Sequence, residues 1–209
     1  MNCPLCNTHN SNAFPANGKT YYSCSNCGLV YMDGNDHLSN DDEKKRYSFH
    51  QNDINNTGYV NFLNRIIEPA MDFLSKDMHG IDYGCGPNPV LAQIIENKGI
   101  RCDHYDPFFF PEIDTERKYD FIFATECFEH FFSPATELQQ ICNILKPNGI
   151  LGIMTEIMDE NTDFGSWYYK NDPTHVCFFN RKSLEYIKET YGFIELYNDN
   201  HRAIILRKS

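Results

Sequence analysis

Short apolar segments and helix-like segments alternate along the middle of this 209-residue sequence. The apolar segments are residues 80–83, 100–106, 119–125 and 150–155. Between them, apolar residues recur at helical spacing, most clearly in residues 90–95. Because each helix must return the chain to the edge where the next strand begins, repeated strand–helix units predict a mostly parallel sheet with right-handed connections. The pattern therefore predicts an α/β fold in which helices flank one sheet.

The composition along the chain divides it into three parts, which are residues 1–32, 33–57 and 58–209. The first part is rich in turn residues and carries four cysteines, and the second is a polar linker with a short helix near residues 41–50. The third part carries the α/β pattern and ends in a predicted hairpin within residues 193–207.

Two pairs of cysteines stand near the N-terminus, Cys3 with Cys6 and Cys24 with Cys27. The two-residue spacing within each pair lets both thiolates bind one ion, and two such pairs complete the tetrahedral shell of a structural Zn²⁺. The sequence therefore predicts that residues 1–32 form a zinc ribbon holding one structural zinc ion. The alternative is a redox dithiol, which would use one pair and leave the other without a role. Because a shell of four thiolates has no open position, we expect no catalysis at this metal.

A glycine-rich loop at residues 82–87, Asp-Tyr-Gly-Cys-Gly-Pro, joins the first apolar segment to the helix-like residues 90–95. Such a loop lets the backbone approach a ligand closely and directs helix N-terminal amides toward it. The next predicted strand ends in Asp106, roughly 20 residues further on, where an acid can bind ribose hydroxyls. The alternatives are a plain strand–helix turn and a dinucleotide site. Pro89 stands where a dinucleotide site would have its third glycine.

Three motifs, in this order, resemble those of class I, Rossmann-like methyltransferases that use S-adenosylmethionine. Residues 82–87 resemble motif I of that family, and residues 119–126, followed by Glu129-His130, are similar to its fourth strand and E-x-x-E-H ending. Residues 145–150, Leu-Lys-Pro-Asn-Gly-Ile, resemble the LKPGG turn before the fifth strand. The cysteine pairs also resemble the zinc-ribbon heads of some methyltransferases, which include an uncharacterised bacterial group, ribosomal RNA guanine methyltransferases and deoxysugar C-methyltransferases.

This resemblance covers residues 58–209 and implies an enzyme that binds S-adenosylmethionine. It implies that Gly84 and Gly86 pass close to the methionine portion, with Asp82 near its amino group. It also implies that Asp106 holds the ribose hydroxyls. The cofactor-binding residues implied by the resemblance are Asp82, Tyr83, Gly84, Cys85, Gly86, Asp106, Pro107, Phe108, Thr125 and Glu126.

The sequence departs from the family's pattern between Asp106 and Tyr119. Members of the family usually fit a helix and a further strand there, and this segment often supplies an acid to the adenine amino group. Here only residues 107–118 are available, which is too few for both elements. We therefore expect an abbreviated third-strand region, with Phe108 packing against adenine as one way to replace the missing contacts.

The acceptor side of the site is predicted from residues 161–179, a long aromatic insertion after the last buried strand. In related methyltransferases, a histidine at the matching H-x-x-F-F position faces the active site, and here that residue is His175. A neutral imidazole can accept a proton, so His175 is the first candidate for a general base. The alternative is a histidine that shapes the loop through backbone hydrogen bonds. Glu126, which with Thr125 would border the methyl group, and His130 are the other catalytic candidates. The alternative role for His130 is structural hydrogen bonding.

The formal net charge is −11, from 18 Lys and Arg against 29 Asp and Glu. Nucleic-acid binding requires basic side chains that neutralise phosphates, so this balance disfavours a large nucleic-acid footprint. We therefore favour a small-molecule acceptor such as a sugar or another metabolite. An RNA base is the alternative, because zinc ribbons often contact nucleic acid. A non-catalytic protein that binds the cofactor and docks a partner through the ribbon is an alternative of another class.

The sequence also indicates where such a protein would reside. It has nine cysteines, an odd number, and the five outside the two pairs are scattered singly, which indicates reduced thiols rather than a disulfide framework. None of its apolar runs reaches the ~18–20 residues that span a bilayer, and its first residues lack the layout of a signal peptide. We expect a cytoplasmic protein with no membrane partner.

Overall fold

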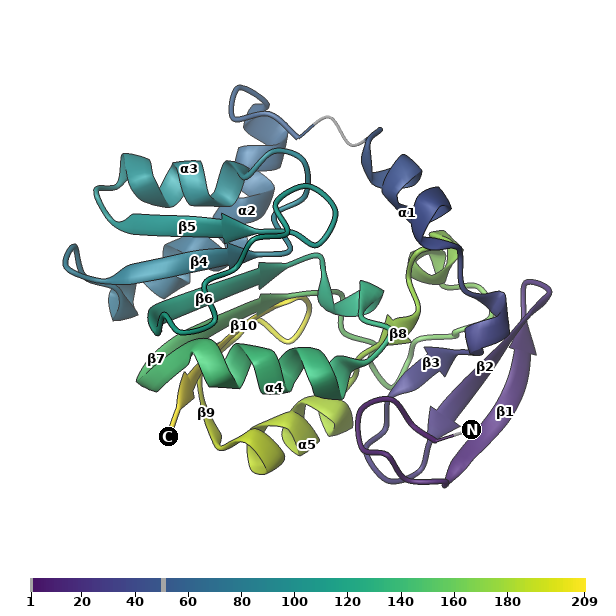
Figure 1. Cartoon of the computed structure of the whole chain (residues 1–209). Helices are drawn as coiled ribbons and strands as arrows, with labels where there is room; N and C mark the ends of the chain where they lie inside the picture. Colours follow the sequence, from purple (N-terminus) through teal and green to yellow (C-terminus); the bar gives the residue numbers. More distant parts are fainter. Residues whose placement is uncertain (1, 50–51) are drawn as a thin grey trace.

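The structure, a computed structural model, describes residues 2–49 and 52–209 and contains two sheets (Figure 1). The larger sheet has six strands in the order β5-β4-β6-β7-β10-β9. Its strands are β4 (His79–Tyr83), β5 (Arg101–Tyr105), β6 (Tyr119–Thr125), β7 (Leu145–Met154), β9 (Phe193–Asn198) and β10 (Ala203–Lys208). The first four are parallel, and the antiparallel hairpin of β9 and β10 completes the sheet. The predicted mostly parallel sheet and closing hairpin are confirmed.

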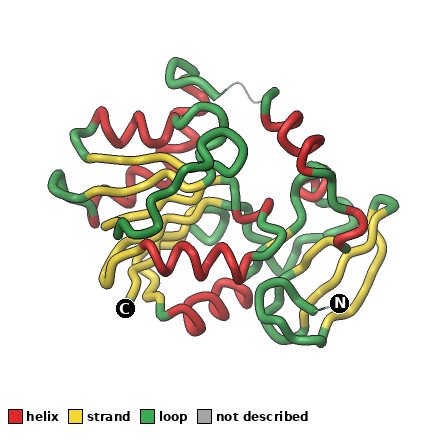
Figure 2. The backbone as a smooth tube through the Cα atoms, in the orientation of Figure 1, coloured by secondary structure: helices red, strands yellow, loops and turns green. Residues whose placement is uncertain are grey.

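Helices cover both faces of this sheet (Figure 2). α2 (Thr57–Ala70) and α3 (Val90–Asn97) lie on one face, and α4 (Pro134–Ile144) and α5 (Arg181–Tyr191) lie on the other. Alternate side chains of a strand point to opposite faces. In β6, Phe121 and Phe123 accordingly join the core under α2 and α3, whereas Ile122 and Ala124 join the core under α4 and α5. A strand that is apolar on both faces is what the sequence predicted for residues 119–125.

Residues 106–118, all of which are described, form neither a helix nor a full strand between β5 and β6. A single antiparallel bridge between Asp106 and Phe110 closes a tight loop instead. β5 is consequently the edge strand of the sheet. The predicted abbreviation of the third-strand region is confirmed.

The smaller sheet joins the N-terminal residues to the α/β domain. It contains β1 (Ser11–Ala16), β2 (Lys19–Cys24), β3 (Val30–Met32) and β8 (Cys177–Phe178). β8 belongs to the aromatic insertion, and its antiparallel pairing with β3 fixes the insertion against the first 32 residues. Leu29 of the N-terminal segment is fully buried in the same core as Phe178 and Phe179. A segment too small for a core of its own is thus packed on the larger domain.

The segment between the two sheets contains α1 (Asn40–Tyr47), which begins after the capping residue Ser39. Its predicted end near residue 50 falls outside the described residues. Arg46 of α1 forms a two-pronged ion pair with Asp172 of the insertion, with Nη2 of the arginine 2.5 Å from the carboxylate. The remaining short elements are the 3-10 helices at Gly34–Asp36, Met71–Phe73, Phe128–His130 and Tyr168–Asn171. Within the described part of the chain, none of the helices is long and apolar enough to span a membrane.

The close packing of β7 on β6 yields a stability prediction. An added Cβ at Gly152 would lie 2.5 Å from the Phe123 ring and 3.4 Å from Ile66. We expect Gly152→Ala to lower the free energy of unfolding by roughly 1–3 kcal/mol through overpacking. Gly34→Ala is the matched control, since a Cβ there meets none of the described atoms within 4 Å. Urea unfolding midpoints measure both, and equal midpoints for the two variants would contradict the packing described.

Candidate active site

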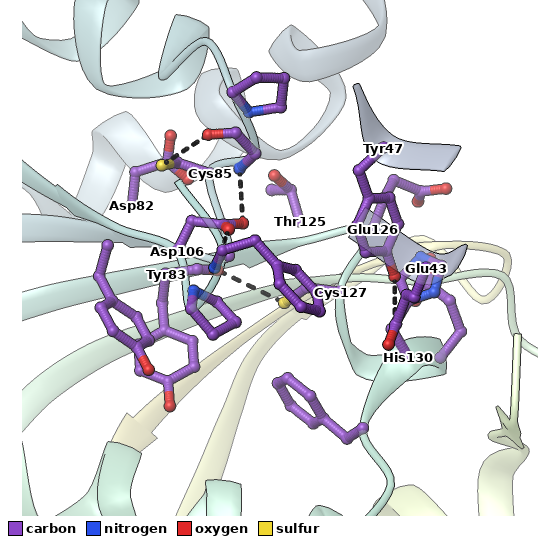
Figure 3. A pocket seen from close by; sticks show the side chains of 18 of the residues that line it. Glu43, Tyr47, Asp82, Tyr83, Cys85, Asp106, Thr125, Glu126, Cys127 and His130 are labelled. Carbon is purple, nitrogen blue, oxygen red and sulfur yellow. Dashed lines mark hydrogen bonds and ion pairs between the residues drawn. The ribbon is translucent and has the colours of Figure 1, made fainter. Parts of the chain in front are cut away.

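A cavity of about 850 Å³ opens at the carboxyl ends of the parallel strands. Its walls include residues 84–87 after β4, residues 106–108 after β5, the last residue of β6, Thr125, and residues 126, 127, 129 and 130 after β6. The carboxyl edge of an open α/β sheet is where ligands of such folds bind, because the loops after parallel strands meet there. Figure 3 shows Asp82 and Asp106 on one side of this cavity and Tyr47, Glu43 and His130 on the other.

The glycine-rich loop adopts backbone conformations that favour glycine. Gly84 and Gly86 have φ values of 81° and 66°, in the left-handed region that side chains with a Cβ rarely adopt. A Cβ at Gly84 would also lie 2.7 Å from Cys127. The amides of Gly84 and Cys85 donate to the carbonyl of Tyr105, which holds the loop against β5. The loop therefore presents bare backbone to the cavity, as the sequence predicted.

Asp106 is buried at the end of β5 and connects two loops. Its Oδ2 accepts from the amide of Gly86 at 3.0 Å, and its Oδ1 accepts from the amides of Phe108 and Phe109 at 2.9 and 3.2 Å. The carboxylate thus organises the glycine-rich loop and the following turn, in addition to lining the cavity. Its predicted contact with ribose hydroxyls would use the remaining lone pair of Oδ2, because both lone pairs of Oδ1 accept from backbone amides.

Asp82 is 2% exposed and lies at the base of the cavity. Its Oδ2 accepts a long hydrogen bond of 3.4 Å from the amide of Ala92, whereas its Oδ1 has no partner among the described residues. Burial raises the pKa of this carboxyl to about 7. A buried acceptor without a donor is costly, so the position favours a ligand that donates to it.

Glu126 follows β6 with a φ of 50° and a backbone amide that donates to Met154. Both of its carboxylate oxygens accept from Nη1 of Arg202, at 2.7 and 2.6 Å. Arg202 also forms an ion pair with the buried Glu156. The sequence did not indicate Arg202, because it lies in the turn before β10 and belongs to none of the motifs.

Glu129, His130 and His175 meet at the far wall of the cavity. One ligand atom of each lies within 4.8 Å of the others. Nδ1 of His130 is 2.9 Å from the carbonyl oxygen of Thr174, and Nδ1 of His175 is 2.7 Å from that of Tyr169. Burial lowers the pKa of the His130 imidazole, which favours its neutral form.

The structure brings all twelve residues predicted for cofactor binding and catalysis to this one cavity. It also adds wall residues that the sequence analysis placed in a linker. Glu43 and Tyr47 of α1 line the cavity, with the tyrosine hydroxyl donating to the glutamate at 2.8 Å. Their four-residue spacing, which puts both on one helix face, was the available signal.

The four N-terminal cysteines form a separate cluster. Their sulfurs lie within 4.8 Å of one another, with Cys3 and Cys27 3.5 Å apart and Cys6 and Cys24 also 3.5 Å apart. Four sulfurs bound to Zn²⁺ at ~2.3 Å in a tetrahedron lie roughly 3.8 Å apart. The cluster thus has the composition and approximate spacing of a closed tetrathiolate site. None of the four lines the cavity.

The chain resembles known proteins in sequence and in fold. A family model described as a methyltransferase domain matches residues 56–195. Among proteins of curated function, none matches the chain. The mitomycin 7-O-methyltransferase MmcR superposes with a TM-score of 0.51 at 12% identity, over 74% of this chain and 59% of that one. LaPhzM superposes with a TM-score of 0.52 at 14% identity, over 71% of this chain and 55% of that one. This chain thus spans less than two thirds of each of these proteins, and such identities show a shared fold only.

The buried position of Asp82 yields a pH prediction. Its pKa in the folded protein, about 7, lies above the ~3.9 of an unfolded aspartate, so the folded protein loses stability as pH rises between these values. Asp82→Asn removes this titration and can still accept from Ala92. Without cofactor, we expect the free energy of unfolding of the variant minus that of wild type to increase by roughly 2–3 kcal/mol from pH 4.5 to pH 8. Denaturant unfolding at both pH values measures it, and a difference independent of pH would contradict the burial described.

Proposed function

The chain belongs to the methyltransferase family whose model it matches, and on that premise we propose that it transfers a methyl group from S-adenosylmethionine to a small-molecule acceptor. The negative charge of the cavity is the main support for a small-molecule acceptor. Its lining includes seven carboxylates, which are Glu43, Asp82, Asp106, Glu126, Glu129, Glu137 and Asp172. The described lining contains neither Lys nor Arg.

This charge pattern disfavours an RNA acceptor. RNA recognition places basic groups against phosphates, whereas a wall of carboxylates repels them. α1 and the insertion also enclose the cavity, since Arg46 and Asp172 connect them beside it. A compact acceptor that is neutral or cationic fits such a site better than a polyanion does.

The cofactor half of the site fits S-adenosylmethionine on structural grounds. The unpartnered Oδ1 of Asp82 would accept from the amino group of the methionine portion, beside the bare backbone of Gly84 and Gly86. Asp106 would accept from the ribose hydroxyls at the end of β5, with Pro107 and Phe108 beside the adenine. The surrounding carboxylates would stabilise the positive sulfonium.

When bound, the cofactor supplies an activated methyl group on a sulfonium, so the protein contributes alignment and exclusion of water. Glu126 directly follows β6, where Arg202 holds its carboxylate in the wall of the cavity. Thr125, Cys85 and Tyr83 complete the wall on the cofactor side. We assign His130 and His175 to the acceptor side, beside the acceptor's nucleophilic atom.

We further propose that Cys3, Cys6, Cys24 and Cys27 bind one structural zinc ion. The ion would hold together residues 1–32, whose sheet carries β8 of the acceptor-side insertion. Because β8 directly follows His175 and Val176, the zinc would support the position of the catalytic histidine from a distance. No step of the transfer passes through this metal.

The function is tested by a screen for transfer of tritiated methyl groups. Purified protein and labelled S-adenosylmethionine are incubated with fractions of a cell extract, with and without nuclease treatment. We expect label in a low-molecular-mass product that nuclease does not affect. Label confined to nuclease-sensitive material would overturn the small-molecule acceptor, and a complete absence of transfer would count against the enzymatic role.

The zinc site is tested by elemental analysis of the purified chain. We expect about one zinc per chain, lost in Cys24→Ser, with a lower thermal midpoint because the metal stabilises the folded segment. Cys142→Ser is the matched control, since Cys142 lies on α4 outside the cluster and should leave the zinc content unchanged. The proposal would be refuted by wild-type protein that contains no zinc and has the same thermal midpoint as Cys24→Ser.

A further inference from the structure

One carboxylate oxygen in the acceptor half of the cavity has no partner. The Glu129 side chain is fully buried, and its Oε2 accepts from the hydroxyl of Thr155 at 2.7 Å. Its Oε1 makes no hydrogen bond within the described part of the structure. The nearest cationic candidate, Nε2 of His130, is 3.9 Å away, which is too far for a hydrogen bond. A buried carboxylate oxygen left in this state favours a ligand.

The hydrogen bonds of the two neighbouring histidines fix which ring nitrogen can bind a ligand. Carbonyl oxygens only accept, so Nδ1 of His130 must donate to Thr174 and Nδ1 of His175 must donate to Tyr169. In the neutral imidazoles, the lone pair is therefore on Nε2 of each ring. A backbone carbonyl on the other ring nitrogen is the usual outer-shell support of a metal-binding histidine.

The backbone holds the three side chains in a fixed register. The amide of Val176 donates to the carbonyl of Glu129 at 2.8 Å, so the residues next to each of them, His175 and His130, lie side by side. Their ring centroids are 4.8 Å apart. The three donor groups are thus organised before any ligand binds, two from the segment after β6 and one from the insertion.

We propose that Glu129, His130 and His175 bind one divalent transition-metal ion whose open positions receive a hydroxyl oxygen of the methyl acceptor. Two imidazoles and a carboxylate on one side of an ion leave several coordination positions free, in contrast with the closed cysteine cluster. This inference rests on the proposed function, because it assigns the acceptor to the same cavity. It narrows the acceptor class to hydroxyl compounds and the product to a methyl ether.

The charges of the surrounding residues support a cation at this position. Glu126 and Glu156 share the guanidinium of Arg202, whereas Glu129 forms no ion pair with a lysine or arginine of the described residues. The carboxylates of Glu126, Glu129 and Glu156 therefore have only one permanent positive charge among them, the guanidinium of Arg202. A divalent ion would offset this excess in a buried environment where unpaired charge is costly.

The metal would act on the acceptor by lowering the pKa of its bound hydroxyl. The hydroxyl proton would leave to solvent, the oxygen would form the new bond to the methyl carbon, and the carbon–sulfur bond would break. The electron pair of that bond would remain on sulfur, giving neutral S-adenosylhomocysteine. No external oxidant or reductant is needed.

The test is a titration of the full-length, zinc-loaded protein with Mn²⁺, followed by electron paramagnetic resonance of the free ion. Manganese prefers carboxylate and imidazole over thiolate, so it does not compete for the cysteine cluster. We expect one Mn²⁺ per chain. Glu129→Gln, which can still accept from Thr155, and His175→Asn should each weaken the affinity about 10–100-fold.

Glu137→Gln is the matched control because it removes a carboxylate from the same cavity but outside the three-residue cluster. It should retain wild-type Mn²⁺ affinity. Equal losses in the control and in Glu129→Gln would show nonspecific attraction to an acidic cavity and would overturn the site. Absence of a Mn²⁺ site in wild-type protein would do the same. Urea unfolding of every variant tests whether it is folded. Glu129→Gln and His175→Asn each remove one proposed metal ligand, so the test still holds if one of the two variants does not fold.

Two further measurements separate this inference from the proposed function. Calorimetry with S-adenosylhomocysteine on the same preparations tests the cofactor site without metal or turnover. If the protein binds the cofactor but not Mn²⁺, the proposed metal site is refuted and the methyltransferase assignment still stands. Once an acceptor is found, transfer by the metal-free enzyme at an unchanged rate would also refute the metal's role and favour direct proton acceptance by His175.

Discussion

Parallel pairing of β4 with β5 and β6 is the constraint on which the site depends. It forces the carboxyl ends of neighbouring strands onto one edge of the sheet, so residues that are distant in sequence meet there. Asp82, Asp106 and Glu126 reach the cavity for this reason, Asp82 from the last but one residue of β4 and the other two from the residue directly after β5 and β6. The glycine conformations after β4 then let a ligand approach the backbone that these carboxylates surround.

The second constraint is the cost of burying charge. Among the described residues, the two buried carboxylate oxygens that lack a hydrogen-bond partner belong to Asp82 and Glu129, and both residues line the cavity. They lie in the two parts of the proposed site, Asp82 in the proposed cofactor region after β4 and Glu129 in the proposed acceptor region after β6. Arg202 stabilises the acidic groups between them by binding Glu126 and Glu156. The same electrostatics favour cationic ligands and disfavour polyanionic acceptors.

The sequence predicted the parts of this arrangement that local patterns encode. Strand–helix alternation predicted the sheet, and the short stretch after Asp106 predicted its abbreviated edge. Other features depend on tertiary contacts that spacing does not reveal. α1 was predicted as part of a linker, yet Arg46 and Asp172 fix it beside the cavity. The pairing of β3 with β8, which joins the N-terminal segment to the insertion, also has no local signature.

Calorimetry with S-adenosylhomocysteine is the decisive test of whether the cavity after β4 binds the methyltransferase cofactor. We expect one binding site per chain, with Asp106→Ala weakening the affinity at least about tenfold because each lost charge-assisted hydrogen bond contributes roughly 1.5–3 kcal/mol. The exposed Asp114, which does not line this cavity, provides the control variant and should leave the affinity unchanged. If folded wild-type protein does not bind at high micromolar cofactor, this cavity is not a cofactor site.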